Sequence, residues 1–404
     1  MLARKAPKNG SAGAAAPVEG RDNISNLPDG VLHHILSFLP AQDVVRTCVL
    51  AKSWRHMWES TTVLRFVWGG TNEPESMIPE FVDHLLRLRI RGCTPLDTCE
   101  FRLLGYHEID MTRINFWIRI ALQCKVRVLE LMCWGIPPLD DHPIFISQYL
   151  KKLQLAGLSD DEMPSRLLDF SCCPNLEDLK IVDCYLGCAL LISSQSLKRL
   201  TIENGSFGPD CRMPICAPNL VSLWLEVSNG MIPSLQRMPS LLAAYVNIDS
   251  DVDCIDSDDD DDDGDDDEDN QSILLQGLSD VQNLVLKSFW TEMIIFRRDL
   301  KFCSSFNKLK SLLINEYWCE PPDFSALACL LKLSPVLEKL TLQLYSEGPE
   351  HEVEIKLSCK PLEMSAAISQ HLKAVEVKCQ VYDERVRNVL TFLSKLDILW
   401  FQII

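Results

Sequence analysis

Residues 176–184 read LEDLKIVDC, and this stretch holds the pattern that decides the fold: apolar, two variable residues, apolar, one variable residue, apolar. Alternate residues of a β-strand point to opposite faces. Leu179 and Ile181 are therefore expected to enter one core, while Lys180 between them faces out. The stretch predicts a short strand with one buried face.

The same pattern recurs between residue 126 and residue 398. The first copies start at residues 126, 150, 176, 197, 220 and 241, so consecutive starts lie 24, 26, 21, 23 and 21 residues apart. This spacing is typical of leucine-rich repeats. The copies are Val126-Leu129-Leu131, Leu150-Leu153-Leu155, Leu176-Leu179-Ile181, Leu197-Leu200-Ile202, Leu220-Leu223-Leu225, a degenerate Leu241-Ala244-Val246, Val281-Leu284-Leu286, Leu309-Leu312-Ile314, Leu337-Leu340-Leu342, Leu372-Val375-Val377 and Leu393-Leu396-Ile398.

A repeat of this size cannot bury its own apolar face, so neighbouring copies stack into a solenoid whose strands share one surface. The predicted fold class is α/β, with an irregular leucine-rich-repeat solenoid over residues 62–404. Cys184 stands where such repeats often carry Asn or Cys, and most other copies lack that residue. An unrelated α/β domain with leucine-rich strands is the alternative. The outward residues predicted to bind a substrate are Lys152, Gln154, Lys180, Arg199, Thr201 and Trp224.

Residues 22–61 form a separate unit with clear helix punctuation. Pro28 suits the first helical position, where its missing N–H is no loss, and Pro40 ends that helix. Three short helices of this size bury little surface by themselves. Part of their apolar surface is therefore expected to meet a partner. The apolar faces of the three helices carry Val31, Leu32, Ile35, Leu36 and Leu39; Val44, Val45, Cys48 and Val49; and Leu50, Trp54, Met57 and Trp58.

The order Leu27-Pro28-Asp29, then ILSFLP at residues 35–40, then Val44-Val45-Arg46-Thr47 and Trp54-Arg55 resembles the F-box. Plant members commonly read Ser-Lys-Arg-Trp where this chain has Ala51-Lys52-Ser53-Trp54, which leaves the apolar pattern intact. The resemblance implies docking onto a Skp-type adaptor that is held by a cullin scaffold. A plain three-helix bundle without a partner is the alternative. The resemblance assigns to the adaptor interface Leu27, Pro28, Ile35, Leu36, Leu39, Pro40, Val44, Val45, Val49, Leu50 and Trp54.

Residues 371–403 predict a strand, a turn at Tyr382-Asp383 and a helix. This order resembles the start of the plant F-box-associated module called FBD, and we assign residues 365–404 to an FBD-like terminal part. Plain repeats would give a similar pattern. With this module, the resemblance covers nearly all of the chain after residue 22 and implies a plant F-box protein with leucine-rich repeats. The apolar face of the predicted helix carries Val386, Val389, Leu390 and Leu393.

Acidic charge is concentrated in one run. Residues 256–269 hold twelve Asp or Glu and no Lys or Arg, so the net charge of −18 falls to −6 over the rest of the chain. A block of like charge repels itself, so residues 250–271 are expected to form a disordered surface loop. The run opens like an EF-hand calcium loop, with Asp259, Asp261, Asp263 and Gly264, but Asn270 stands where the bidentate Glu belongs. Calcium binding is therefore not expected.

Cysteine usage and charge narrow the cellular setting. The 17 Cys include no C-x-x-C pair, and disulfide-stapled secreted folds are normally much shorter, which favours buried thiols in the cytoplasm and/or nucleus. Residues 1–21 favour a disordered tail over a transit peptide. The longest uncharged stretch, residues 184–197, is too short to span a membrane. Outside the acidic run there is no strongly basic segment, so nucleic acid is not an expected partner.

Motifs of catalysis are missing from the sequence, which contains no G-x-S-x-G, Walker-type loop, G-x-G-x-x-G or H-E-x-x-H. His33 and His34 are adjacent on the first predicted helix, so they point apart and make a poor metal pair. We assign no cofactor, metal or catalytic residue. The resemblance implies a non-catalytic adaptor that receives a protein substrate for a ubiquitin ligase. A free-standing leucine-rich-repeat scaffold and an enzyme with its own active site are the alternatives, and the apolar face of residues 27–58 favours the adaptor.

Overall fold

The chain divides into two compact units, Met1–Thr61 and Thr62–Ile404, in a computed structural model. The predicted tail (residues 1–21) and acidic loop (residues 250–271) lie outside the described residues. Of the FBD-like part, only residues 371–395 and 402–403 are described. The structure describes residues 27–68, 78–92, 94–103, 111–133, 145–158, 168–187, 191–209, 212–249, 274–288, 299–300, 303–319, 324–345, 371–395 and 402–403.

The N-terminal unit contains three short α-helices joined by 3₁₀ turns. Pro28 and Pro40 immediately precede α1 and α2, with φ angles of −58° and −56°. Because neither proline has an N–H to leave unsatisfied, both fit a helix start. The elements are α1 (Asp29–Leu36), α2 (Ala41–Arg46), η1 (Thr47–Val49), η2 (Lys52–Trp54) and α3 (Met57–Ser60).

The core of this unit is small and draws one stripe from each helix. Its buried members are Leu32, Leu36, Val44, Trp54 and Met57. Partly buried side chains pack around them, namely Leu27, Leu39, Ala51 and Trp58. Each fully buried side chain of this kind contributes roughly 1.5–3 kcal/mol, so these few residues hold the unit together.

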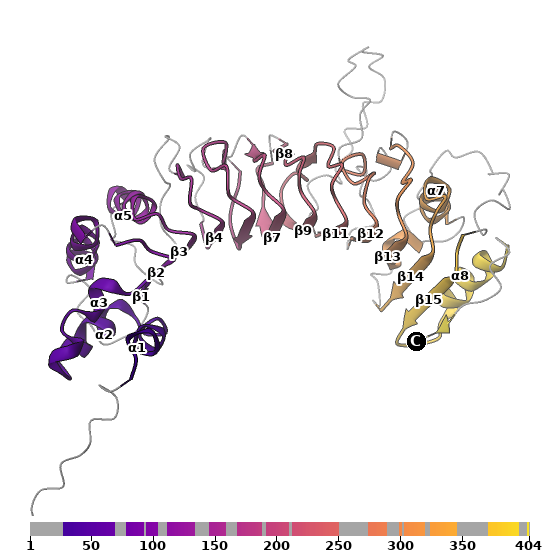
Figure 1. Ribbon diagram of the computed structural model, residues 1–404. Coiled ribbons are helices and arrows are strands. Elements are labelled where there is room, and N and C mark those ends of the chain that lie inside the picture. The colour runs from indigo at the N-terminus through magenta and orange to yellow at the C-terminus, as the bar shows by residue number, and fades with distance from the viewer. Residues whose placement is uncertain are drawn as a thin grey trace, which may run out of the picture. The chain divides into compact units, whose positions relative to one another are not determined.

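The C-terminal unit is built on a thirteen-stranded parallel sheet whose strand order follows the chain (Figure 1). Three very short strands, β6, β8 and β10, form a second parallel sheet. The strands of the large sheet are β1 (Val63–Trp68), β2 (Thr98–Leu103), β3 (Val128–Cys133), β4 (Lys152–Ala156), β5 (Asp178–Val182), β7 (Arg199–Ser206), β9 (Ser222–Asn229), β11 (Ala243–Ile248), β12 (Asn283–Ser288), β13 (Ser311–Asn315), β14 (Lys339–Leu344), β15 (Ala374–Cys379) and β16 (Gln402–Ile403). The other elements are α4 (Ile78–Gly92), α5 (Met111–Gln123), β6 (Ile192–Ser193), β8 (Pro214–Cys216), β10 (Ser234–Leu235), η6 (Glu316–Cys319), α7 (Ser325–Leu333) and α8 (Glu384–Lys395).

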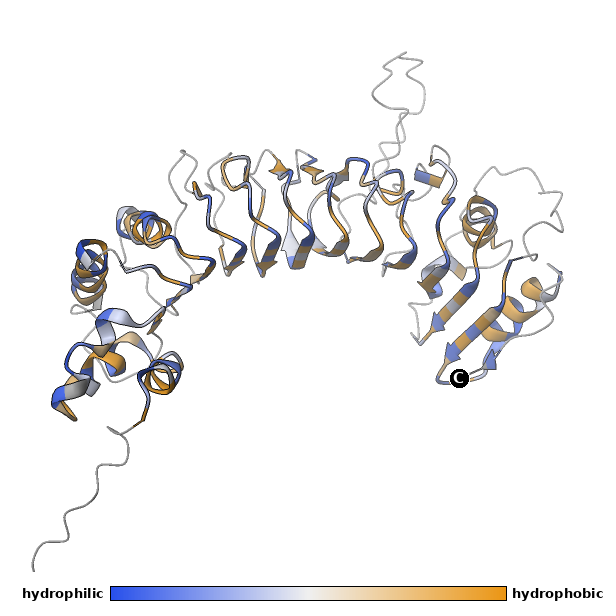
Figure 2. Cartoon of the chain, in the orientation of Figure 1, coloured by the Kyte–Doolittle hydropathy of each residue, from blue (hydrophilic) through white to orange (hydrophobic). Residues whose placement is uncertain are grey.

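The predicted triplets from Val126 to Val377 are confirmed as the buried side of this sheet. Every residue of these triplets is at most 5% exposed. The register aligns them strand by strand, so that Leu179 pairs with Leu153 on one side and Leu200 on the other. Figure 2 shows the resulting alternation of apolar and polar residues along the strands. The alternation of buried and outward-facing residues therefore holds in the strands from β3 to β15 of the large sheet.

The sheet starts earlier than the sequence pattern indicates. Two further strands, β1 and β2, precede Val126 and carry the same buried triplet as Thr61-Leu64-Phe66 and Leu96-Cys99-Phe101. Thr61 and Cys99 hide the pattern, because a search for large aliphatic residues passes over them. The intervals are also long, since α4 and α5 lie between these strands.

The C-terminal end both confirms and corrects the sequence analysis. Asp383 directly precedes the predicted helix, α8, and its Oδ1 accepts a hydrogen bond from the Val386 N–H at 2.9 Å. The apolar face predicted for α8 is buried. The repeat predicted from Leu393 is wrong at its first residue, because Leu393 belongs to α8; Leu396 and Ile398 lie outside the described residues. The next strand in the described part is β16, where Ile403 pairs with Val377. The helix periodicity overrides the strand pattern there.

Replacing residues 252–270 with a short Gly/Ser linker is expected to leave the melting temperature nearly unchanged. The strands on either side, β11 and β12, pair directly from Ala243↔Asn283 to Ile248↔Ser288. The buried side chains before the second strand, Leu274, Leu275 and Leu278, lie outside the replaced segment. Thermal unfolding of the full chain checks this expectation, and a large loss of stability would show that the acidic run is part of the fold.

Asp280→Asn is expected to lower the melting temperature at pH 7, by an amount that shrinks as the pH falls below the usual range of an Asp carboxyl. The Asp280 carboxylate accepts ion pairs from Lys308 at 2.8 Å and Arg237 at 3.0 Å, which hold its pKa below the usual range. A lowered folded-state pKa stabilises the protein above the unfolded pKa, and this contribution is lost as pH falls through the folded pKa. Both cations are more than half exposed, so the expected loss is about 1 kcal/mol. A wild-type advantage that kept the same size at every pH would contradict the ion-pair explanation.

Candidate partner-binding surfaces

The first helix of the N-terminal unit has two apolar stripes rather than one. Leu32 and Leu36 are 2% and 0% exposed and face the core. Val31 and Ile35 are 44% and 42% exposed, and Phe38, at the next helical spacing, is 65% exposed. Val31 and Ile35, four residues apart, lie on the same side of α1, and Phe38 follows in the turn after its last residue. We call these three exposed side chains the outward apolar stripe. One side of α1 therefore packs in the core of the unit, and another side exposes apolar side chains to solvent.

A second apolar patch is exposed in the turn after α2. Val49 and Leu50 are 84% and 70% exposed. Five of the fifteen large hydrophobic side chains that are exposed in the described part of the chain belong to residues 27–61. Such a concentration in a small unit marks an interaction surface, whereas scattered exposed side chains are ordinary.

The residues predicted to contact the adaptor fall into three groups. Pro28, Ile35, Val49 and Leu50 are exposed, and Leu27, Leu39, Pro40 and Val45 are half-buried. Leu36, Val44 and Trp54 are buried in the unit's own core and present no surface to a partner. The sequence prediction joined both stripes because both are apolar. It left out Val31 and Phe38, which helical spacing from Ile35 could have found.

In the C-terminal unit, the side of the large sheet opposite the core carries two aligned rows of side chains, which we call the outward face. The first row includes Lys152, Asp178, Arg199, Ser222 and Ala243; the second includes Gln154, Lys180, Thr201, Trp224 and Tyr245. All six residues predicted to bind a substrate lie in these rows. Their alternation follows from the buried triplets on the other face.

Two of the predicted substrate residues already have ionic partners. Lys180 Nζ lies 2.8 Å from Glu203 Oε1, and Arg199 lies 3.1 Å from Asp178. To bind a charged group of a substrate, Lys180 and Arg199 would have to break these ion pairs at least in part. Their contribution to binding a charged substrate is therefore reduced.

Trp224 does not stand alone on the outward face. Its ring stacks on that of Tyr245, with centroids 3.8 Å apart and an angle of 11° between the planes. Trp224 is nevertheless 39% exposed. The second row continues with Val285 and Leu313, both half-buried. The sequence prediction found Trp224 and missed its three neighbours, although the same position in each later repeat could have identified them.

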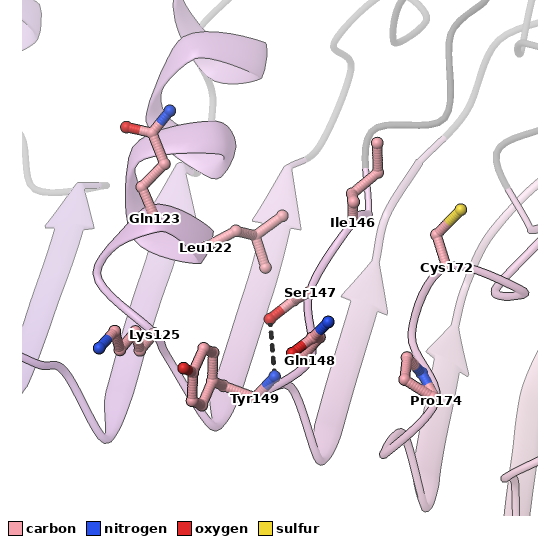
Figure 3. A pocket seen from close by; sticks show the side chains of 9 residues that line it. All are labelled: Leu122, Gln123, Lys125, Ile146, Ser147, Gln148, Tyr149, Cys172 and Pro174. Atoms are coloured by element: carbon pink, nitrogen blue, oxygen red, sulfur yellow. Dashed lines mark hydrogen bonds between the residues drawn. The ribbon is translucent and has the colours of Figure 1, made fainter.

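An open groove of about 500 Å³ lies elsewhere, between the end of α5 and the segments that precede β4 and β5 (Figure 3). Its apolar walls include Leu122, Ile146 and Tyr149, and Lys125 Nζ lies 5.4 Å from the centre of the Tyr149 ring. Ser147 accepts hydrogen bonds from the N–H groups of Tyr149 and Leu150, which fixes the turn before β4. The polar and apolar groups in this groove are mixed.

Thiol chemistry follows burial in the described residues. Burial raises the pKa of Cys173 and Cys184 to about 11. Cys184, singled out by the repeat pattern, donates to the Val182 carbonyl at 3.2 Å. Among the residues that the structure describes, no three His, Cys, Asp or Glu side chains gather in a possible metal site, and no helix is long and apolar enough to cross a membrane.

Several known plant proteins are similar to this chain in sequence. A model of the F-box domain matches residues 24–66, which places the N-terminal unit in the F-box class. F-box/LRR-repeat protein 25 of Arabidopsis thaliana is 33% identical over 240 residues, covering 52% of this chain and 87% of that relative. An Arabidopsis F-box/FBD/LRR-repeat protein is 26% identical over 94% of this chain and 91% of its own length. The rice protein MEIOTIC F-BOX protein MOF is 28% identical over 88% of this chain and 80% of its own length.

These relatives and the strand array agree on one assignment. The chain belongs to the plant F-box/LRR-repeat protein family. The FBD in the name of one relative accords with the strand and helix at residues 371–395.

Proposed function

We propose that this protein is the substrate-recognition subunit of an SCF-type (Skp–cullin–F-box) ubiquitin ligase. The observation that carries the proposal is the outward apolar stripe on α1, in a unit that matches the F-box domain. Val31, Ile35 and Phe38 are exposed in the free chain, and their burial against a partner would stabilise the complex. A Skp-type adaptor is that partner, and it links the chain to the cullin scaffold.

We infer that the parallel array is a leucine-rich-repeat solenoid and that its outward face binds the protein substrate. Regular strand order, burial of the triplets and the names of the relatives support this inference. The adaptor positions the substrate, and ubiquitin transfer belongs to another subunit of the ligase. The protein therefore uses no cofactor. We place this activity in the cytoplasm and/or nucleus, because a chain of this length with 17 Cys and no C-x-x-C pair is unlike a disulfide-stapled secreted fold.

A free-standing leucine-rich-repeat scaffold is the second candidate, since a repeat surface can bind partners without a ligase. The two differ in the role of the exposed N-terminal stripe. We expect the full chain to co-purify with a recombinant Skp-type adaptor and its cullin in equimolar amounts. Failure of the wild-type chain to bind any such adaptor would favour the scaffold.

A further inference from the structure

The outward face of the large sheet changes character between its flanks and its centre. On the flanks, the first two rows of β5 and β7 carry Asp178, Lys180 and Arg199, and those of β14 and β15 carry Lys339 and Glu376. In the centre, eight successive positions on four neighbouring strands are uncharged. This uncharged band consists of Ser222 and Trp224 on β9, Ala243 and Tyr245 on β11, Asn283 and Val285 on β12, and Ser311 and Leu313 on β13.

The charges on both flanks are compensated within the sheet. Asp178 pairs with Arg199 at 3.1 Å, Lys180 with Glu203 at 2.8 Å, and Lys339 with Glu376 at 2.7 Å. The ion pair with Lys339 also holds the pKa of Glu376 below its usual range. The flanks therefore do not form a cationic cradle of the kind that recognises a phosphate group.

The third row borders the band without giving it a net charge. Glu226 on β9 and Lys287 on β12 stand in register on either side of Asn247. Lys287 Nζ lies 5.9 Å from the centre of the Tyr245 ring, so it already faces the aromatic stack. Directly before β9 and β11, Val221 and Leu242 are 36% and 46% exposed and extend the apolar surface.

From this arrangement we infer that the uncharged band is the substrate-docking surface and that it binds an uncharged protein segment with aromatic or branched aliphatic side chains. The inference deepens the proposed function and rests on it for the statement that the ligand is a protein. The stacked rings of Trp224 and Tyr245 form a broad apolar surface. Because the stack already restricts both side chains, they lose little conformational entropy on binding, and aromatic side chains of this kind are typical of binding hot spots. Four strands about 4.8 Å apart give a width of about 14 Å, enough for four or five extended residues.

A phosphorylated or acidic segment fits this surface poorly. Seating a carboxylate or phosphate over the band would remove it from water without a compensating partner, which costs several kcal/mol. Recognition is therefore independent of substrate phosphorylation and changes little with salt, in contrast to charge-driven binding.

The test uses the full chain and a random twelve-residue peptide library, displayed both unmodified and with phosphoserine at fixed positions. The selected sequences are then synthesised, and their affinities are measured by fluorescence anisotropy. We expect enrichment of aromatic and branched aliphatic residues, no advantage from phosphoserine, and an affinity that changes less than about twofold between 50 and 300 mM salt.

Variants locate the binding site. Trp224→Ala and Tyr245→Ala are each expected to lower the affinity for the selected peptides by about 30-fold, the effect of a hot spot worth about 2 kcal/mol. Tyr382→Ala, in the turn before α8, and Phe116→Ala on α5 remove aromatic side chains that are 55% and 37% exposed outside the outward face. They are the matched controls and are expected to change affinity less than about threefold. Val285→Gln removes apolar surface without opening the aromatic stack, so it keeps the test valid if Trp224→Ala lowers the melting temperature.

Three results would overturn the inference: selected peptides rich in Asp, Glu or phosphoserine, binding that survives both aromatic substitutions and Val285→Gln, or no selected binder. Binding of the Skp-type adaptor is measured on the same preparations. If the chain binds the adaptor but selects acidic peptides, only the inference that the uncharged band binds the substrate is refuted. A chain that binds no adaptor refutes the ligase proposal and leaves the peptide result standing.

Discussion

Ile35→Asp is expected to abolish binding of the Skp-type adaptor while the N-terminal unit stays folded, whereas Leu36→Asp is expected to unfold that unit. The two residues are neighbours on α1, but Ile35 is 42% exposed and Leu36 is fully buried. A charge at Ile35 remains in water in the isolated chain and is desolvated only at the interface. A charge at Leu36 is desolvated by folding itself, at a cost of several kcal/mol.

The expected loss of adaptor affinity for Ile35→Asp is about 100-fold or more, which corresponds to about 3 kcal/mol. Titration calorimetry of the full chain with the recombinant adaptor measures it. Hydrogen exchange over residues 29–60 reports folding and should be slow in Ile35→Asp and fast in Leu36→Asp. Undiminished adaptor binding by Ile35→Asp would refute the proposed docking stripe.

Val49 and Leu50 provide an independent test in case the helix is sensitive to any charge. Both lie in or directly after the turn η1 and are more than two-thirds exposed. The double variant Val49→Asp/Leu50→Asp is therefore expected to fold and to lose adaptor binding. His56→Asp is the matched control, because it adds one carboxylate to the same unit at a polar side chain that is 75% exposed. It should bind like the wild type.

The repeat pattern predicted most of the large sheet because a strand with one buried face obeys a strict period of two. Leu153 and Leu155 enter the core, and Gln154 cannot do so without shifting the whole strand. The same rule placed Trp224 on the outward face before its surroundings were known. It fails at β2, where Cys99 replaces an aliphatic residue, and at Leu393, where a helix satisfies the same spacing.

The sequence alone did not show which apolar side chains of the N-terminal unit belong to its core and which are exposed. Leu32 and Ile35 are both aliphatic and lie close together on one helix, so hydrophobicity cannot tell which of them faces the core. The packing of α1 against other elements decides that question. Trp224 and Tyr245 occupy the same position in successive repeats, so the repeat pattern could indicate that they are neighbours, but only the structure shows that their rings stack.

Gly230→Ala is expected to lower the stability of the C-terminal unit strongly, whereas Gly92→Ala is not. Gly230 follows β9 with a φ of +80°, a conformation that costs a residue with a Cβ about 1–2 kcal/mol. A Cβ at this position would lie 1.8 Å from the Phe207 carbonyl oxygen. The two backbones cannot both keep their places, so the turn must move.

Moving that turn disturbs the hydrogen bonds that join two successive repeats. The Phe207 N–H donates to the Asn229 carbonyl at 2.9 Å, and the Met231 N–H donates to the Gly208 carbonyl at 3.1 Å. Each is worth about 1 kcal/mol, so together with the strain the expected loss is about 3–4 kcal/mol. Thermal unfolding of the full chain should show a melting temperature lower by about 5 °C or more.

Gly92→Ala is the control for this comparison, because Gly92 ends α4 and the nearest atom to its added Cβ would be Thr94 Oγ1 at 3.4 Å. Alanine is favoured over glycine in helices, so this variant is expected to unfold at or slightly above the wild-type temperature. Equal melting temperatures for Gly230→Ala and Gly92→Ala would mean that the turn after β9 relaxes without breaking its contacts. In that case the link between the loops after β7 and β9 would contribute little to the stability of the array.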